Sequence, residues 1–81
     1  MRHLDEVRTI VSETLGLRGP RLDAASVLLG GVPELDSMAV ISLITALENH
    51  FGFAIDDDEI SASHFATLAT LASFVDAKLA V

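Results

Sequence analysis

The residues best suited to do chemistry are Asp36 and Ser37, which stand directly before an apolar-periodic segment. Asp is favoured at the N-cap of a helix, and this places Ser37 in the first helical turn. A hydroxyl there lies at the positive end of the helix dipole, beside backbone N–H groups that have no intrahelical partner. A phosphate attached to Ser37 would be stabilised at that position. The same two residues are also common as a plain helix cap, so the dipeptide alone leaves both interpretations open.

A second candidate is the run of four acids that begins at Asp56. A calcium loop starting there would need glycine at its sixth position and glutamate at its twelfth, where this chain has Ser61 and Thr67. We instead predict a short helix over residues 56–60, with Asp56 as its N-cap and acids in its first turn. The three histidines have no metal-ligand spacing, and no Gly-x-Ser-x-Gly elbow surrounds Ser37. We therefore expect no metal site and no catalytic residue.

Composition and charge narrow the class of protein. The chain has 81 residues, of which 12 are acidic and five are Lys or Arg, and its formal net charge is −7. This length suits one hydrophobic core, so we expect a single domain over residues 1–81. Nucleic acids and anionic membranes attract positive surfaces, so the charge argues against both as partners. No apolar run approaches the roughly 20 residues of a membrane span. We expect a cytoplasmic monomer whose partners carry basic patches.

Apolar residues recur at helical spacing in three segments, which we expect to form the longer helices. The first segment begins at Leu4 and is closed by Gly16, and the second ends at Gly52. The third follows Thr67, a residue suited to an N-cap. Strand signals are poor, because no segment alternates apolar and polar residues for long. The expected buried stripes are Leu4, Val7, Val11 and Leu15; Val40, Ile44, Leu47 and Phe51; and Leu68, Leu71, Ala72, Val75 and Leu79.

The stretch between residues 18 and 36 cannot be one continuous helix, because it contains two prolines and three glycines. A loop of this length is uncommon in a compact domain unless it is functional or anchored. Large apolar residues within it are able to anchor it across the open end of a helix bundle. These residues are Leu22, Val27, Leu28, Leu29, Val32 and Leu35. The predicted fold class is all-α, with three longer helices, one short helix and a long anchored loop.

Taken together, these features resemble the acyl carrier protein family over nearly the whole chain. They follow one another in order: the anchored loop, Leu35-Asp36-Ser37-Met38 before a helix, Leu47-Glu48 and Phe51 on that helix, Ile55 with an acidic turn, and Thr67-Leu68 at the start of the last helix. The resemblance implies that the helices form a four-helix acyl-carrier-like bundle.

The resemblance also implies a chemical role for Ser37. In this family the serine is the attachment point of 4′-phosphopantetheine, an arm that comes from coenzyme A and holds acyl groups as thioesters on its terminal thiol. Asp36 would help present Ser37 to a magnesium-dependent phosphopantetheinyl transferase. The implied protein is a carrier and not an enzyme. Its further partners would be acyl-activating or acyl-transferring enzymes of fatty-acid, polyketide or related pathways.

The chain departs from the family pattern most clearly on the second predicted helix. Family members often display several acids there for docking, whereas Glu48 is the only acid among the outward-facing residues of this chain. Glu34 also replaces a frequent glycine, and Met38 replaces a usual leucine. We predict that partner enzymes contact Met38, Ile41, Thr45 and Glu48, and that these contacts depend on apolar burial more than on charge.

Two alternatives to an acyl carrier stay open at this point. An aminoacyl or peptidyl carrier for a ligase system shares the serine and the fold. An unmodified acidic helical adaptor would use Ser37 only as a residue of a helix start.

Overall fold

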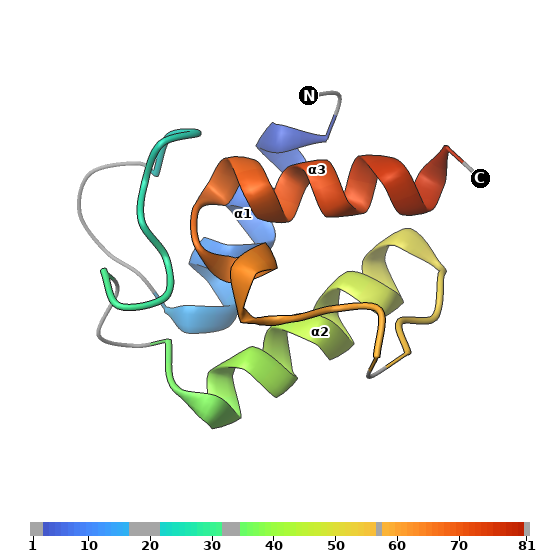
Figure 1. Cartoon of the computed structure of the whole chain (residues 1–81), viewed down its shortest axis with the longest axis horizontal. Helices are drawn as coiled ribbons and strands as arrows, with labels where there is room; N and C mark the ends of the chain where they lie inside the picture. Colours follow the sequence, from blue (N-terminus) through green and yellow to red (C-terminus); the bar gives the residue numbers. More distant parts are fainter. Residues whose placement is uncertain (1–2, 17–21, 32–34, 57, 81) are drawn as a thin grey trace.

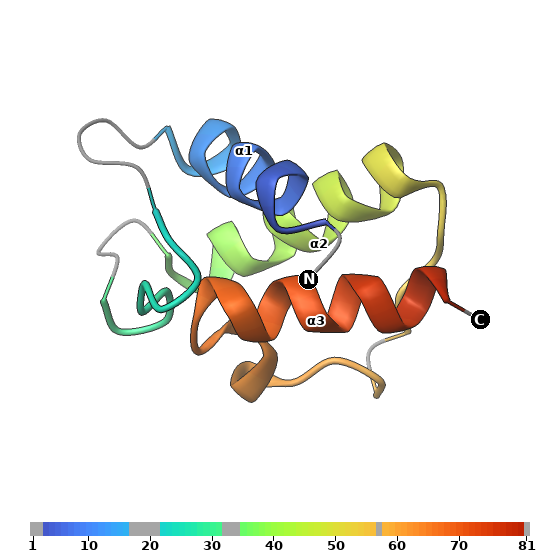
Figure 2. The same ribbon diagram turned by 90° about the horizontal axis from the view of Figure 1, so that it is seen from above.

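The computed structural model describes residues 3–16, 22–31, 35–56 and 58–80. In that part of the chain it contains three α-helices, α1 (Leu4–Leu15), α2 (Ser37–Phe51) and α3 (Leu68–Leu79). A short 3-10 helix, η1 (Ala62–Phe65), precedes α3. Figures 1 and 2 show α2 and α3 running in the same general direction with α1 beside both. The described residues form no strand, and the predicted all-α class is confirmed.

Local sequence signals set three of the helix ends. Gly16 and Gly52 end α1 and α2 in the left-handed conformation, with φ angles of 64° and 75°, which glycine adopts without a steric penalty. Thr67 caps α3, because its hydroxyl accepts the Thr70 N–H at 3.1 Å. These three ends match the prediction from sequence. Among the described ranges, no helix has the length and apolar character needed to cross a bilayer.

The short helix does not lie where the sequence predicted it. The described part of the acidic run forms only a turn, in which the Asp56 N–H donates to the Glu59 carboxylate at 2.8 Å. The same carboxylate also accepts a hydrogen bond from Lys78 of α3 at 2.7 Å. Helical structure begins only after Ser61, whose N–H donates to His64 Nδ1 at 2.9 Å. The predicted acidic helix is therefore wrong, because a contact with a distant helix and a later cap decide the local structure.

The core forms where the three α-helices meet, and it shows that α2 is rotated relative to the prediction. Leu43 and Leu47 are fully buried, whereas Val40 and Ile44 are only partly buried. Leu79, the last residue of the predicted α3 stripe, is exposed because the stripe extends past the end of the core. The buried core residues are Val7, Ile10, Val11, Leu28, Leu35, Leu43, Leu47, Ile55, Phe65, Leu68, Leu71, Ala72 and Val75.

The loop between α1 and α2 is anchored, but by fewer side chains than predicted. Leu28 and Leu35 are buried in the core. Val27 and Leu29 are exposed, because the chain is extended at a bridge to the segment before α3 and successive side chains point to opposite sides. Val32 lies outside the described residues. The loop thus has buried side chains that hold it to the core and exposed apolar side chains on its outer surface.

Backbone hydrogen bonds of 2.9–3.0 Å fasten this loop to the segment that joins η1 and α3. Two of them supply acceptors to the first turn of α3, whose N–H groups have no intrahelical partner. The donor–acceptor pairs are Leu28–Ala66, Leu29–Phe65, Leu68–Ser26 and Ala69–Ala24.

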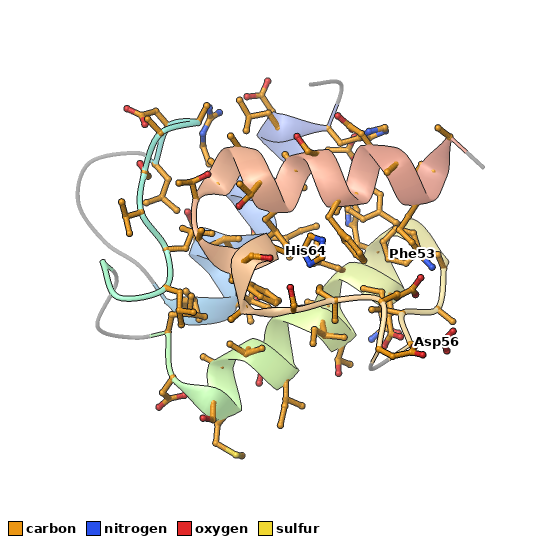
Figure 3. All side chains as sticks on the ribbon, in the orientation of Figure 1. Phe53, Asp56 and His64 are labelled. Atoms are coloured by element: carbon orange, nitrogen blue, oxygen red, sulfur yellow. The ribbon has the colours of Figure 1, made fainter. Side chains whose placement is uncertain are left out.

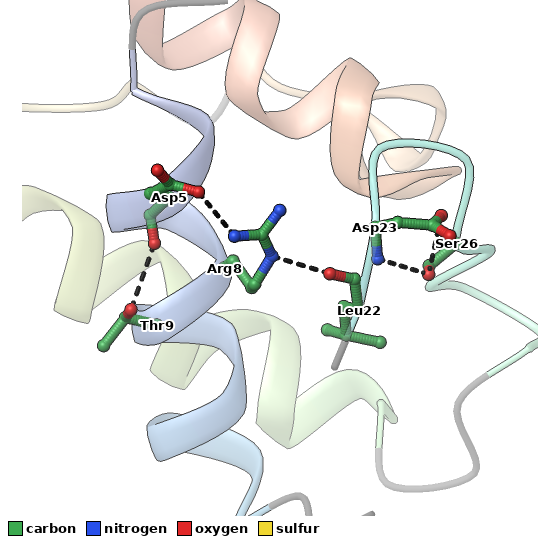
Figure 4. A network of polar contacts seen from close by, with 6 residues as sticks. All are labelled: Asp5, Arg8, Thr9, Leu22, Asp23 and Ser26. Atoms are coloured by element: carbon green, nitrogen blue, oxygen red, sulfur yellow. Dashed lines mark hydrogen bonds and ion pairs between the residues drawn. The ribbon is translucent and has the colours of Figure 1, made fainter. Parts of the chain in front are cut away.

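Arg8 of α1 holds the beginning of the described loop (Figure 4). Its Nε donates to the Leu22 carbonyl at 2.6 Å, and a terminal guanidinium nitrogen pairs with Asp5 on the same helix. The loop then closes a turn in which the Asp23 N–H donates to the Ser26 hydroxyl at 2.9 Å. The Arg8 contact thus fixes this part of the loop against α1.

Candidate functional site

Ser37 is the first residue of α2, as the sequence predicted, and it is exposed. Asp36 is the N-cap: its Oδ1 accepts the Ala39 N–H at 2.9 Å, and its carbonyl accepts the Val40 N–H at 2.9 Å. Within the described residues, no hydrogen bond engages the Ser37 hydroxyl. The hydroxyl therefore stands uncommitted at the positive end of the helix dipole.

A groove of about 590 Å³ opens beside Ser37. One wall is α2, and the opposite wall combines the α1–α2 loop with η1 and the residues just before it. Most of its lining is apolar. The lining residues are Leu29, Asp36, Ser37, Val40, Ile44, Ile60, Ser61, Ala62 and Phe65. The groove explains why Val40 and Ile44 are only partly buried.

The η1 wall of this groove was not predicted from the sequence, where the residues between Ile60 and Thr67 carry no clear helical pattern. A signal for that wall is present in the spacing of Ser61 and His64. A capping box places Glu or Gln three residues after a Ser or Thr N-cap, and His64 takes that place here. A capping-box pattern that also accepts histidine at its last position would have located the start of η1.

The predicted partner-contacting residues divide into two groups. Met38 and Ile41 are 73% and 61% exposed, and Thr45 is exposed with its hydroxyl bonded to the Ile41 carbonyl at 3.1 Å. These three follow one another along one side of α2. Glu48 continues the stripe, but its carboxylate accepts the Ile55 N–H at 2.8 Å. That carboxylate is therefore engaged by the segment after α2.

The far end of α2 gathers aromatic and histidine rings. The Phe51 ring stacks on Phe53, with ring centroids 5.7 Å apart. His3 and His50 both meet the Phe51 ring in edge contacts, at 5.6 and 4.7 Å. Figure 3 places Phe53 and Asp56 together at this end of the molecule, away from the first turn of α2. We call this end, with Phe51 at its centre, the ring end.

Polar side-chain contacts also tie helices together at the ring end. His3 lies 2.6 Å from Asp76 of α3, and His50 lies 2.9 Å from Glu6 of α1. The Lys78–Glu59 hydrogen bond and then the Asp56 N–H lower the pKa of Glu59. In the part of the chain that the structure describes, no three His, Asp or Glu side chains converge as a metal site would require. These side chains hold the fold together.

Comparison with known proteins identifies the family of the chain. Residues 5–76 match the family model described as "Phosphopantetheine attachment site". A holo acyl carrier protein from Nitrosomonas europaea has a TM-score of 0.92 and 55% sequence identity, with 100% of both chains covered. A holo acyl carrier protein from Geobacter metallireducens has a TM-score of 0.80 and 25% identity, covering 99% of this chain and 88% of that one. No curated protein matches the chain.

The family match and the fold together establish the class of the protein. The family model spans nearly all of the described helices, and both solved neighbours are acyl carrier proteins. Proteins of this class carry groups for enzymes and are not enzymes themselves, so the expected carrier role is confirmed at this level. The chain belongs to the phosphopantetheine-attachment family of acyl carrier proteins.

Proposed function

We propose that Ser37 carries a 4′-phosphopantetheine arm whose terminal thiol holds acyl groups as thioesters. The observation that carries this proposal is the exposed, uncommitted Ser37 hydroxyl at the start of a helix of 15 residues. A phosphodiester at that place gains about 0.3–1 kcal/mol from the helix dipole. The Nitrosomonas relative, whose solved form is a holo protein, supports the same assignment.

The proposed attachment breaks the phosphoanhydride bond of coenzyme A and forms a phosphodiester at Ser37. The Ser37 oxygen attacks the phosphorus that bears pantetheine in coenzyme A, and a Ser37 O–P bond forms. The bond from that phosphorus to the bridging oxygen breaks, and the nucleotide part leaves with that oxygen. The hydroxyl proton passes to the transferase. Asp36, whose carboxylate stands one residue before Ser37, is proposed to orient the serine in that complex.

The groove beside Ser37 supports an acyl cargo. Val40 and Ile44 face it from α2, and Leu29 and Phe65 face it from the opposite wall. An apolar chain that lies against these side chains gains about 0.8 kcal/mol for each CH₂ removed from water. An aminoacyl group, with its charged ammonium, gains less from such walls. We therefore favour acyl cargo over the aminoacyl or peptidyl alternative.

The proposed partners are a phosphopantetheinyl transferase and acyl-activating or acyl-transferring enzymes of fatty-acid, polyketide or related pathways. The proposed setting is the cytoplasm, where coenzyme A supplies the arm. In this role the chain itself catalyses nothing and serves as a mobile substrate for several active sites.

The test is an intact-mass measurement after incubation with coenzyme A, magnesium and a broad-specificity phosphopantetheinyl transferase. The wild-type chain should gain one phosphopantetheinyl group. Ser37→Ala should gain none and keep its helical circular dichroism, whereas Ser42→Ala, on the same helix, should still be modified. An unmodified wild-type chain would favour the adaptor alternative, and modification at Ser42 or Ser26 would show that the wrong serine was assigned.

A further inference from the structure

Exposed large apolar side chains are concentrated at the start of α2 and on the loop before it. Five such side chains are exposed among the described residues, and four of them lie on the start of α2 or on the neighbouring loop. Leu29, which is 40% exposed, lines the same groove as Ser37. Scattered exposed apolar residues are common, but a group at one site marks a surface that another molecule covers. We call Leu29, Met38 and Ile41 the apolar rim.

The same part of α2 is free of charged side chains. None occurs from Ser37 to Leu47, and the next residue, Glu48, has its carboxylate engaged by the Ile55 N–H. The Asp36 carboxylate is bonded within the helix cap. A molecule that covers the apolar rim therefore meets mostly apolar atoms and small hydroxyl groups, with no row of carboxylates.

The apolar rim is also continuous with the attachment residue. Ile41 and Thr45 lie roughly 6 and 12 Å along the helix axis from Ser37. An enzyme that modifies Ser37, or that acts on the group it carries, must approach this side of α2. We infer that the apolar rim docks such enzymes through an apolar, uncharged contact surface on the enzyme and not through a basic one. The inference rests on the proposed function.

The proposed partner contacts differ from those expected from the sequence at two residues. The sequence placed Glu48 among the partner contacts and treated Leu29 as a loop anchor. The structure engages the Glu48 carboxylate inside the chain and exposes Leu29 across the groove from α2. The docking surface therefore draws on two elements, the loop and α2, with Ser37 between them.

The first test measures kcat/KM of the broad-specificity transferase on apo-protein variants. Ile41→Ser should lower it roughly tenfold, as expected when one anchoring side chain is truncated. Leu79→Ser, which also removes an exposed apolar side chain but at the other end of the molecule, should change it less than about twofold. The wild-type rate should vary little between low and high salt, because apolar contacts are not screened. An unaffected Ile41→Ser variant with a steep wild-type salt dependence would overturn the inference.

The second test adds the charge that α2 lacks. Holo-protein with Ser42→Glu and Thr45→Glu should be a better substrate than wild type for a standard fatty-acid-synthesis acyltransferase that docks on acidic carriers. The gain should shrink as salt rises. Ser73→Glu, which adds one glutamate on the exposed side of α3, should give no gain. Equal activity and equally steep salt dependence of wild type and the double variant would contradict the inference.

Two further measurements test whether a lipid surface or a second copy of the chain covers the apolar rim. Co-sedimentation with neutral phosphatidylcholine vesicles, lost in Ile41→Ser, would assign the rim to a lipid surface and overturn the inference. A dimer in light scattering that the same substitution dissociates would assign it to a second copy of the chain and do the same. Failure of the proposed function looks different, because the wild-type chain would then gain no phosphopantetheinyl mass at all.

Discussion

The two ends of α2 are held by different forces. At the ring end, two histidines and one lysine contact carboxylates. One of these contacts joins α2 to α1, and the other two join α3 to the residue before α1 and to the segment after α2. Around Ser37, the helix start is held by the Asp36 cap, and apolar side chains face outward. Hydrogen bonds and ion pairs fix the relative positions of the elements that they join. Exposed apolar side chains instead release their surrounding water when a partner covers them, which is favourable in free energy. The chain places its fixed contacts away from Ser37, the proposed attachment residue.

The largest expected effect comes from the core between these two ends. Leu47→Ala should lower the free energy of unfolding by about 2–5 kcal/mol, because Leu47 is fully buried and its truncation leaves a cavity. Urea denaturation followed by circular dichroism measures the change. Met38→Ala, a truncation on the exposed side of the same helix, should cost less than about 0.5 kcal/mol. A loss below that value for Leu47→Ala would mean that the rotation of α2 is wrong.

A smaller effect is expected at the Ser37 end. Asp36→Ala should destabilise the protein by about 1 kcal/mol through loss of the cap and should also slow modification of Ser37. Asp36→Asn keeps a capping side chain and removes the charge, so it should restore most of the stability. Comparing modification rates for the two variants by mass spectrometry separates the cap from the carboxylate. If Asn restores the rate as fully as the stability, the carboxylate has no role of its own in modification.

The smallest effect is expected at the ring end and depends on pH. Because the folded-state pKa of Glu59 is lowered, first by Lys78 and then by the Asp56 N–H, its contribution is present above the ordinary glutamate value of about 4.3. It is lost as the pH falls through the folded-state value. The Tm of Glu59→Gln should therefore lie below that of wild type at pH 7, and the gap should close in acid.

The matched control for this measurement is Asp58→Asn, which removes an exposed acid one residue away. It should leave the Tm close to that of wild type across the same pH range. A Glu59→Gln gap that persists unchanged in acid would show that the side chain contributes by packing and not by its charge.

The features that the sequence predicted well are those set by neighbouring residues. Glycine ends α1 and α2, Thr67 caps α3, and Asp36 caps α2 directly before Ser37. Each of these depends on side chains and dihedral angles within one helical turn. The position of the candidate site was therefore accessible from sequence, whereas its modification stays a prediction.

The features that the sequence missed are set by distant residues. Glu59 is bonded to Lys78, 19 positions later, and no local pattern reports that contact. Val27 and Leu29 have the same apolar character as the buried Leu28. Only pairing with the segment before α3 makes the chain extended there and turns alternate side chains outward.

The hydrogen bonds between the loop and the η1–α3 segment have a mechanical consequence for the groove. The Leu29 N–H donates to the Phe65 carbonyl at 3.0 Å, so the loop and η1 parts of the far wall are bonded to each other. In the described residues, no backbone hydrogen bond links α2 to that wall, so we expect the groove to widen by movement of α2 relative to the wall. Because Leu29 belongs to the wall and Ile41 belongs to α2, the distance between these two side chains would change with the width of the groove. We expect a cargo that widens the groove to change the shape of the surface that a partner meets.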